Sequence, residues 1–334
     1  MRALILTGVG TLEVDDIPEP PPDRRALVAV EKAGICGTDL SIRSGHIPVE
    51  YPRVLGHEVV GRVVRPGAER RFAEGARVLV DPAVSCGHCH LCMADRANLC
   101  PNGGLIGRDM DGGLAEYVAV DEKQLLPISS GVPLEDAGLL QVLGVCVRAQ
   151  SLIHVFPGQV AAVIGLGVGG LLHAQLLRAR GARVVGITRS ESKRALAERL
   201  GATVTCAPDE AESRVQDFTD GRGADVVVES AGTVETLAKS IELVRGGGTV
   251  LQYGTIAESE GRLPFYELYY KEINLVSSRA ALLRDYAASI DLVSSGDIQV
   301  APLLSATFAL DDGAAAFAAI DTRTDLIKVL LDVG

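Results

Sequence analysis

Three side chains near the start of the sequence are of types that bind metal: Cys36, His57 and Glu58. Thiolate, imidazole and carboxylate are ligands that zinc accepts, and a set of three leaves a fourth coordination position for a reacting oxygen. Taken singly, Cys36 would be a small buried residue and His57 a hydrogen-bonded core histidine. Together, with the run G-H-E-x-x-G around His57, they predict an open catalytic zinc site.

A second cluster consists of four cysteines spaced C-x2-C-x2-C-x7-C, namely Cys86, Cys89, Cys92 and Cys100. Four thiolates complete a tetrahedral shell with no free position, as a structural zinc site requires. The alternatives are four unrelated reduced cysteines or an iron–sulfur cluster, which also takes four thiolates. The crowding of four of the seven cysteines into fifteen residues favours structural zinc.

A glycine-rich run, G-L-G-V-G-G, follows an apolar stretch and precedes a predicted helix; its cofactor-binding residues are expected to be Gly165, Gly167, Val168 and Gly170. Glycines at this spacing allow a tight turn and bring backbone N–H groups close to a pyrophosphate at the helix N-terminus. The alternative is a turn that uses glycine only for packing. Because strands and helices go on alternating after it, the run predicts dinucleotide binding.

The residues that follow the next predicted strand indicate which dinucleotide binds. An acidic residue there would accept the ribose 2′-hydroxyl of NAD, but this chain has Thr188, Arg189, Ser190 and then Lys193. Hydroxyl and guanidinium groups suit a 2′-phosphate, so we expect NADP(H) to be preferred over NAD(H). Alternatively, Arg189 and Lys193 are a solvated helix start, and NAD binds without its usual acidic partner.

The pattern of short apolar runs predicts two kinds of domain. Residues 1–130 contain short β runs separated by Pro- and Gly-rich breaks, which indicates a barrel-like β domain. A helical segment is expected after Pro133, and from Gln159 strands and helices alternate, which indicates a parallel sheet covered on both faces. We expect domains at 1–150 and 151–282, with a segment 283–334 that ends in two helices and a strand.

Composition excludes some classes of partner. The 334 residues carry a formal net charge of −11, which argues against nucleic-acid or anionic-membrane surfaces. Residues 149–177 are uncharged and long enough to span a bilayer, but Pro157, Gly158 and several polar residues interrupt them, so a buried strand–turn–helix is expected. The short apolar run at the N-terminus and the cysteine usage lead us to expect a cytoplasmic protein.

These motifs resemble those of the zinc-dependent medium-chain alcohol/polyol dehydrogenases, in the sorbitol, threonine and glucose dehydrogenase branch. The resemblance rests on C-G-T-D from Cys36, G-H-E-V-V-G from Gly56, the four-cysteine loop, G-G-L-A-E-Y from Gly112 and the glycine-rich run. It implies an α/β fold in which a doubly wound Rossmann domain is inserted into a GroES-like β-barrel catalytic domain. It also implies hydride transfer between a small-molecule alcohol or ketone and the nicotinamide, in a homodimer or homotetramer.

The resemblance also suggests roles for the residues next to the metal ligands. Thr38 matches the hydroxyl that bonds the substrate oxygen and passes on its proton, and Asp39 matches a carboxylate that orients the histidine ligand. Asp39 could instead only cap a turn. Zinc would act as a Lewis acid on the substrate oxygen.

Two departures from the family pattern bear on the mechanism. Ser41 stands where the family often has a histidine in its proton relay, and Gln141 stands where the sorbitol-like branch has a glutamate. Because a neutral amide is a poorer ligand, Glu58 is the expected third ligand. Two other functions remain open: a zinc-retaining NADPH reductase of an activated C=C or C=N bond, and a non-catalytic nucleotide-binding redox sensor.

Overall fold

The computed structural model describes residues 1–334, which form two compact units. Unit 1 comprises Met1–Gly144, Leu282–Gly296 and Val300–Gly334, and unit 2 comprises Val145–Ala281 with Asp297–Gln299. The chain passes from the first unit to the second inside helix α4 (Leu140–Ser151). A hydrophobic core lies within each unit.

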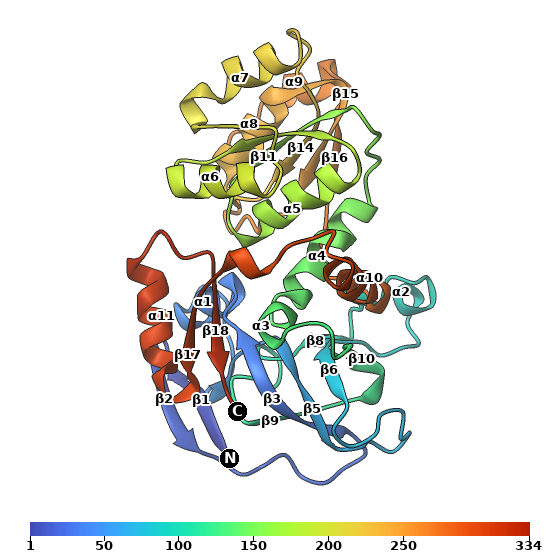
Figure 1. The fold of residues 1–334 in the computed structure, drawn as a ribbon, viewed down its shortest axis with the longest axis vertical. Helices are drawn as coiled ribbons and strands as arrows, with labels where there is room; N and C mark the ends of the chain where they lie inside the picture. Colours follow the sequence, from blue (N-terminus) through green and yellow to red (C-terminus); the bar gives the residue numbers. More distant parts are fainter. The chain divides into compact units, whose positions relative to one another are not determined.

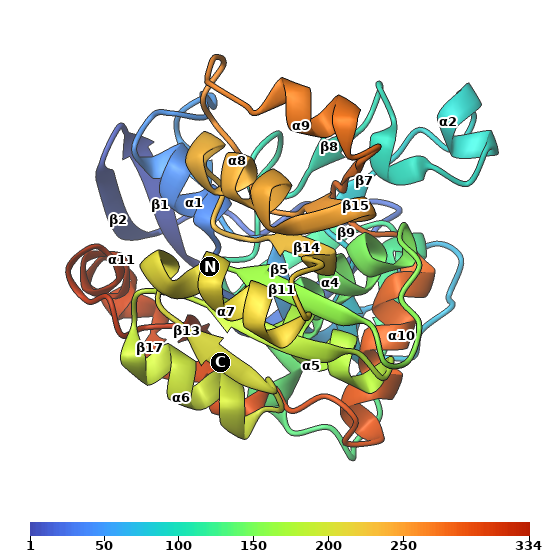
Figure 2. The same cartoon turned by 90° about the horizontal axis from the view of Figure 1, so that it is seen from above.

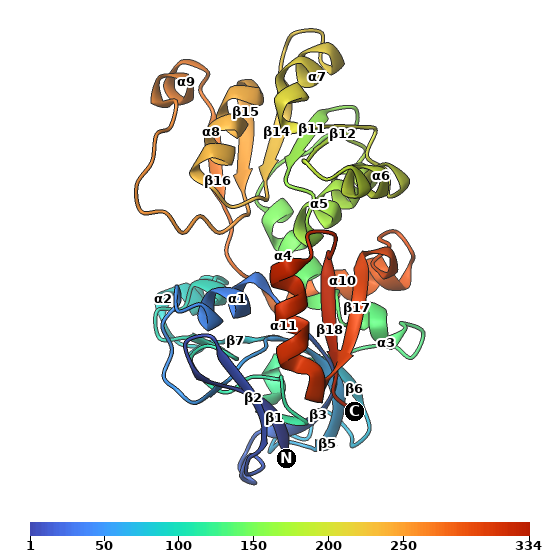
Figure 3. The ribbon, with the colours of Figure 1, turned by 90° about the vertical axis from the view of Figure 1, so that its left-hand side faces the viewer.

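The largest sheet of unit 1 has seven strands, in the order β10-β6-β5-β3-β18-β17, with β9 also paired to β3. Its strands are β3 (Ala26–Gly34), β5 (Glu58–Arg65), β6 (Arg77–Val80), β9 (Tyr117–Val120), β10 (Leu125–Pro127), β17 (Leu304–Ala309) and β18 (Lys328–Asp332). Figure 3 shows the C-terminal strands: β18 pairs with β3, and β17 pairs with the other edge of β18. The chain end therefore completes the sheet that the N-terminal segment begins.

The remaining strands of unit 1 form two small sheets. They are β1 (Arg2–Gly8), β2 (Thr11–Asp16) and β4 (Arg53–Val54) in one, and β7 (Ala83–Val84) and β8 (Gly104–Leu105) in the other. The helices of this unit, besides the start of α4, are α1 (Gly37–Arg43), α2 (His90–Met93), α3 (Leu134–Ala137), α10 (Leu283–Ser294) and α11 (Gly313–Thr322). Single 3₁₀ turns are η1 (Ala97–Leu99), η2 (Glu122–Gln124), η4 (Ala301–Leu303) and η5 (Leu310–Asp312).

The helical segment after Pro133 differs from the prediction, because it is two helices, α3 and α4, rather than one. Gly138 caps the C-terminus of α3 and lies close to β18: a Cβ there would stand 2.7 Å from Leu330 Cδ1. Glycine therefore lets the chain lie close to the sheet where the first helix ends. Helix α1, directly after Cys36, was not predicted; its seven residues are too few for a periodic apolar pattern.

Unit 2 contains a single parallel sheet in the order β13-β12-β11-β14-β15-β16, of which β11, β14, β15 and β16 are labelled in Figure 1. Its strands are β11 (Val160–Ile164), β12 (Arg183–Ile187), β13 (Val204–Cys206), β14 (Ala224–Glu229), β15 (Val244–Gln252) and β16 (Asn274–Ser277). Its helices are α5 (Val168–Ala179), α6 (Glu191–Arg199), α7 (Ala211–Phe218), α8 (Val234–Leu243) and α9 (Phe265–Tyr270), with the turn η3 (Pro208–Glu210). The strand order reverses between β11 and β14, and such a switch point is where open α/β sheets bind ligands.

Helices cover both faces of this sheet, as the alternation of strands and helices predicted. Helices α5 and α6 pack on one face and α8 on the other (Figure 2). The uncharged stretch 149–177 forms the end of α4, the buried strand β11 and most of α5. None of the helices has the length and apolar character needed to cross a membrane.

Candidate metal centres and cofactor site

Cys36, His57 and Glu58 are brought together at one point of unit 1, where their potential ligand atoms lie within 4.8 Å of one another. Cys36 is the N-cap of α1, whereas His57 and Glu58 stand at the beginning of β5. Gly56 supplies the turn before them with a φ of +94°, and a Cβ there would meet Leu114 at 2.6 Å. His57 and Glu58 are buried and Cys36 is partly buried. One thiol, one imidazole and one carboxylate are a donor set that fits zinc and leaves one position open.

A buried lysine lies against this cluster. Lys328, the first residue of β18, forms an ion pair with Glu58 and donates a hydrogen bond to the carbonyl of Ile35 at 2.9 Å. Both charged side chains are almost fully buried, with 2% and 1% of their surface exposed. Gly34 makes room for the pair, because a Cβ there would stand 2.2 Å from Glu58 Oε2 and 2.9 Å from Lys328 Cε.

Asp39 holds the two ligand-bearing segments together. One carboxylate oxygen accepts the N–H of Cys36 at 2.8 Å, and the other accepts the N–H of Gly56 at 3.2 Å. The second oxygen also lies 3.6 Å from Nδ1 of His57. This fully buried carboxylate is therefore placed to orient the imidazole, as such partners do in metal sites.

The same neighbours set the charge of the imidazole. Burial alone lowers the pKa of His57, but the Asp39 carboxylate and the Cys36 sulfur outweigh it and hold that pKa well above 6.5. Both neighbours therefore favour the positively charged imidazole. A metal ion would compete with the added proton, because only neutral imidazole is a ligand.

Thr38 and Gln141 were also singled out in the sequence, and each has a neighbour in the structure. Thr38, in the first turn of α1, has its Oγ1 3.9 Å from the sulfur of Cys36. Gln141 is buried and donates from Nε2 to the phenol oxygen of Tyr286 at 3.4 Å. Tyr286, on α10, is itself fully buried, and burial together with the charge of Asp81 raises its pKa well above 10. Gln141 thus has a partner inside unit 1 that the sequence did not indicate.

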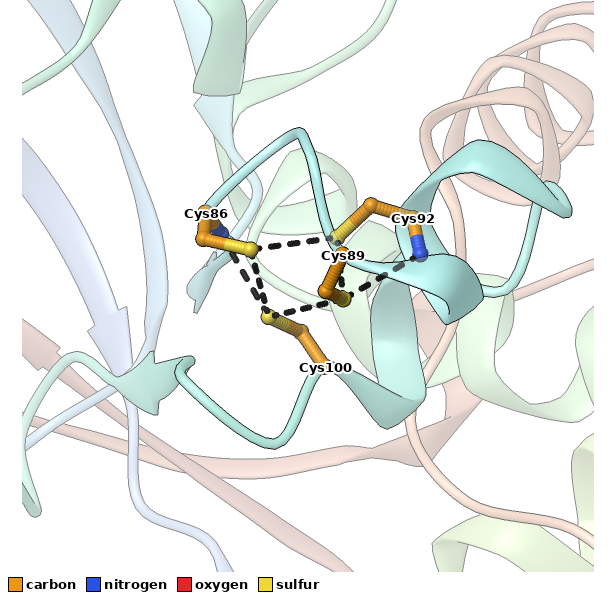
Figure 4. Close-up of side chains that lie close together, drawn as sticks. All are labelled: Cys86, Cys89, Cys92 and Cys100. Atoms are coloured by element: carbon orange, nitrogen blue, oxygen red, sulfur yellow. Dashed lines mark hydrogen bonds between the residues drawn. The ribbon is translucent and has the colours of Figure 1, made fainter.

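The four cysteines of the second cluster face one another across a loop (Figure 4). Four of their sulfur–sulfur distances are 3.5, 3.5, 3.8 and 4.0 Å. A tetrahedral ion with Zn–S bonds of about 2.3 Å requires sulfurs about 3.8 Å apart, so the loop fits zinc without rearrangement. The neighbouring His88 points instead to the backbone carbonyl of Cys86, with Nδ1 2.8 Å from that oxygen.

The local fold explains this preorganised geometry. Cys89 is the N-cap of α2, and its sulfur accepts the N–H of Cys92 at 3.5 Å. The pKa values of the thiols are split: the backbone N–H of His88 helps to lower that of Cys86 to about 6, while burial raises that of Cys92 to about 11. One thiol is therefore ready to bind a cation as thiolate at neutral pH.

The glycine-rich run lies at the carboxyl edge of the sheet in unit 2. Gly165 has a φ of +90°, Gly167 caps α5, and Val168 is the first residue of that helix. A Cβ at Gly170 would stand 1.8 Å from the carbonyl oxygen of Gly165, whereas Gly167 faces open space. The arrangement leaves room for a phosphate at the N-terminus of a twelve-residue helix and fits a dinucleotide.

The residues after β12 form a polar turn that contains no acidic side chain before Glu191. Ser190 caps α6 and accepts the N–H of Lys193 at 3.4 Å, while Arg189 is exposed. Arg194 braces the turn from behind by donating to the carbonyl oxygens of Thr188 and Arg189 at 2.8 and 3.1 Å. This bracing role of Arg194 was missed in the sequence.

On the other side of the switch point, Glu229 shapes the loop after β14. It is fully buried at the end of that strand, and its Oε1 accepts the N–H groups of Ala231 and Gly232, both at 2.8 Å. The same oxygen accepts the hydroxyl of Thr236 at 2.8 Å. A carboxylate at a strand end could have been noticed in the sequence, but the backbone groups that it binds could not.

Comparison with known proteins identifies the family. Residues 22–130 match the alcohol dehydrogenase GroES-like domain, and residues 167–295 match the zinc-binding dehydrogenase domain. The chain is 31% identical over 340 aligned positions to the sorbitol dehydrogenase of Halalkalibacterium halodurans, with 99% of each chain covered. The chain belongs to the zinc-dependent medium-chain alcohol/polyol dehydrogenase family. It is thus an NAD(P)-dependent alcohol dehydrogenase of the medium-chain zinc type, with a GroES-like unit and a Rossmann unit.

Two further relatives illustrate the range of this family. The L-galactonate-5-dehydrogenase of Escherichia coli strain K12 is 32% identical over 293 aligned positions, covering 85% of this chain and 84% of that protein. A zinc-binding dehydrogenase of Sinorhizobium meliloti 1021, solved with NADP bound, superposes with a TM-score of 0.93 at 35% identity and covers 99% of both chains. These comparisons support zinc and a nicotinamide cofactor for this dehydrogenase.

Proposed function

We propose that this dehydrogenase transfers a hydride between NADP(H) and a secondary alcohol or polyol, or the matching ketone, and that it holds two zinc ions per chain. The open cluster of Cys36, His57 and Glu58 carries the proposal, because three donors leave a place for a substrate oxygen. The second ion belongs to the four-cysteine loop, whose closed shell serves folding rather than chemistry.

Each residue of the open site has a proposed role. Cys36, His57 and Glu58 hold the ion, which supplies Lewis-acid polarisation of the substrate oxygen. Asp39 orients His57, and the Thr38 hydroxyl, beside the sulfur of Cys36, bonds the substrate oxygen and passes its proton on. Because Ser41 replaces the relay histidine, a water chain or His46 would have to carry the proton onward; His46 is exposed, and its Nδ1 is paired with the Ser44 hydroxyl at 2.7 Å.

The preference for NADP(H) rests on the turn after β12. Arg189 is exposed there, no carboxylate faces the ribose site from Thr188, Arg189 or Ser190, and Arg194 fixes the turn. We expect Arg189→Ala to lower kcat/KM with NADP⁺ by about tenfold or more and to leave kcat/KM with NAD⁺ nearly unchanged, since a charge-assisted hydrogen bond to phosphate is lost. Arg183→Ala, at the opposite end of β12, is the control. A wild-type preference for NAD⁺ would end this part of the proposal.

The substrate class is proposed from the relatives, whose names include sorbitol and L-galactonate dehydrogenases. The test is a panel of polyols, sugars, cyclitols and simple ketones assayed with both cofactors by absorbance at the nicotinamide wavelength. Turnover of a secondary alcohol that is lost in Cys36→Ser supports the proposal. Reduction of activated C=C or C=N bonds with no alcohol oxidation would favour the reductase alternative instead.

We also propose that the chain forms a homodimer or homotetramer in the cytoplasm. Strand β16 is paired only with β15, so one of its edges is open to a second copy. Helix α9, which ends four residues before β16, exposes four aromatic side chains: Phe265, Tyr266, Tyr269 and Tyr270. Light scattering after size exclusion tests this, and a monomer at micromolar concentration would contradict it.

The seven cysteines carry no disulfide, which suits a reducing compartment.

A further inference from the structure

Tyr253 occupies an unusual position at the carboxyl edge of unit 2. It follows directly after β15, and its ring lies against the second residue of α5, Gly169. A Cβ at Gly169 would stand only 2.5 Å from Cε1 of that ring, so the glycine is what lets the tyrosine lie there. The need for glycine at position 169 is therefore set by Tyr253 and not by the phosphate turn.

Buried neighbours hold the tyrosine ring in place. The Cys146 thiol lies 3.5 Å from the phenol oxygen, and the His173 ring packs edge-on with its centroid 4.5 Å away. His173 is fully buried, and burial lowers its pKa to about 3, so this neighbour carries no charge. Tyr253 itself is only partly buried. An aromatic ring that is fixed from behind and still partly exposed is suited to contact a ligand.

The place of Tyr253 in the sheet indicates which part of a dinucleotide it would meet. The phosphates bind at the N-terminus of α5, and the adenosine half extends over β12, where the Thr188–Ser190 turn lies. The nicotinamide half must therefore extend the other way, over β14 and β15. Tyr253 is on that side, and its N–H donates to the carbonyl of Glu229 at the end of β14 at 2.9 Å.

We propose that Tyr253 is the residue of unit 2 against which the nicotinamide ring binds, and that its aromatic face favours the oxidised, positively charged form of the cofactor. This inference rests on the proposed function, because it requires a dinucleotide at this edge. An aromatic face attracts a cation, by roughly 0.5–1 kcal/mol when exposed and about 2 when desolvated. The reduced nicotinamide is uncharged and gains only the contact.

The test compares complete cofactors with a fragment that lacks the nicotinamide. Isothermal titration calorimetry first decides whether the wild-type zinc enzyme binds NADP⁺ or NAD⁺ more tightly. The oxidised cofactor, its reduced form and the matching fragment (2′-phospho-ADP-ribose or ADP-ribose) are then titrated into Tyr253→Leu. Tyr253→Phe retains the ring, and Phe156→Leu, an exposed aromatic before β11, is a control away from this edge.

For Tyr253→Leu we expect the Kd of the oxidised cofactor to rise about threefold to thirtyfold, the Kd of the reduced cofactor to rise less, and the Kd of the fragment to stay within twofold. Tyr253→Phe and Phe156→Leu should bind all three ligands like the wild type. Equal losses for all three ligands, or equal losses for the oxidised and reduced forms, would overturn the inference. If the wild-type enzyme bound neither cofactor nor fragment, the proposed function would fail instead.

Discussion

Replacing Lys328 with methionine should test whether Lys328 and a metal ion compete for Glu58 at the proposed open site. Lys328 and Glu58 form a buried ion pair, and Glu58 is also one of the three proposed metal ligands. In the absence of the ion, Lys328→Met leaves the buried Glu58 carboxylate without its ion-pair partner. With the ion bound, the metal supplies the missing positive charge.

The magnitudes follow from this difference. Removing one partner of a buried ion pair costs about 3–5 kcal/mol, and Lys328→Met also loses the hydrogen bond to Ile35. The free energy of unfolding of the form without the catalytic ion should therefore fall by about that amount. The zinc-loaded form should lose clearly less, because Glu58 then faces the metal ion. By linkage, the difference must reappear as tighter zinc binding at this site.

The assay is urea unfolding followed by circular dichroism, with the catalytic site loaded or emptied and the zinc content checked by mass spectrometry. Lys32→Met is a matched control: Lys32 is also a buried lysine of the same sheet, but it pairs with Asp332 at 2.9 Å, outside the metal cluster. The loss of unfolding free energy in Lys32→Met should be equal with the catalytic site loaded and with it emptied. Equal losses for Lys328→Met with and without zinc would refute the idea that Lys328 and the metal share Glu58.

Three other substitutions test the buried carboxylate, the four-cysteine loop and the glycine-rich turn. Burial raises the pKa of Asp81 to about 7, so the folded state binds more protons than the unfolded state between about pH 4 and 7 and stability falls as pH rises through this window. Asp81→Asn should therefore gain up to about 4 kcal/mol of unfolding free energy over wild type at pH 8 and almost nothing at pH 4; a pH-independent difference would contradict this. Cys89→Ser should lose one zinc and lower the thermal midpoint, measured by calorimetry, whereas an unchanged midpoint would argue against a structural ion. Gly170→Ala should abolish cofactor binding, because its Cβ would stand 1.8 Å from the carbonyl oxygen of Gly165. Calorimetry measures this binding, and a retained micromolar affinity for the cofactor would refute the close approach.

Much of the fold could be predicted because its signals are local. The glycine-rich run, the four-cysteine spacing and the alternation of strands and helices each depend on residues that are near in sequence. The separation between Cys36 and His57 is also short enough for a motif to show it. The contacts that join these motifs to the rest of the protein are made by residues far apart in the sequence. The sequence patterns therefore did not predict them.

Lys328 illustrates the limit. It lies 270 positions after Glu58, and the two meet only because β18 and β5 both pair with β3. The spacing of apolar residues does not predict which strands pair, and a lysine in the last strand would be expected to be solvated. Gln141 and Tyr286 meet in the same way, through the return of α10 to unit 1. Tyr253 was overlooked because its significance depends on the missing side chain at Gly169.

The central claim is an open zinc site built on Cys36, in addition to the closed one. Zinc per chain, measured by mass spectrometry on purified wild-type protein and on Cys36→Ser, tests it most directly. We predict two zinc ions per chain for the wild type and one for the variant, with the fold retained. One ion in the wild type, or two in Cys36→Ser, would contradict the account.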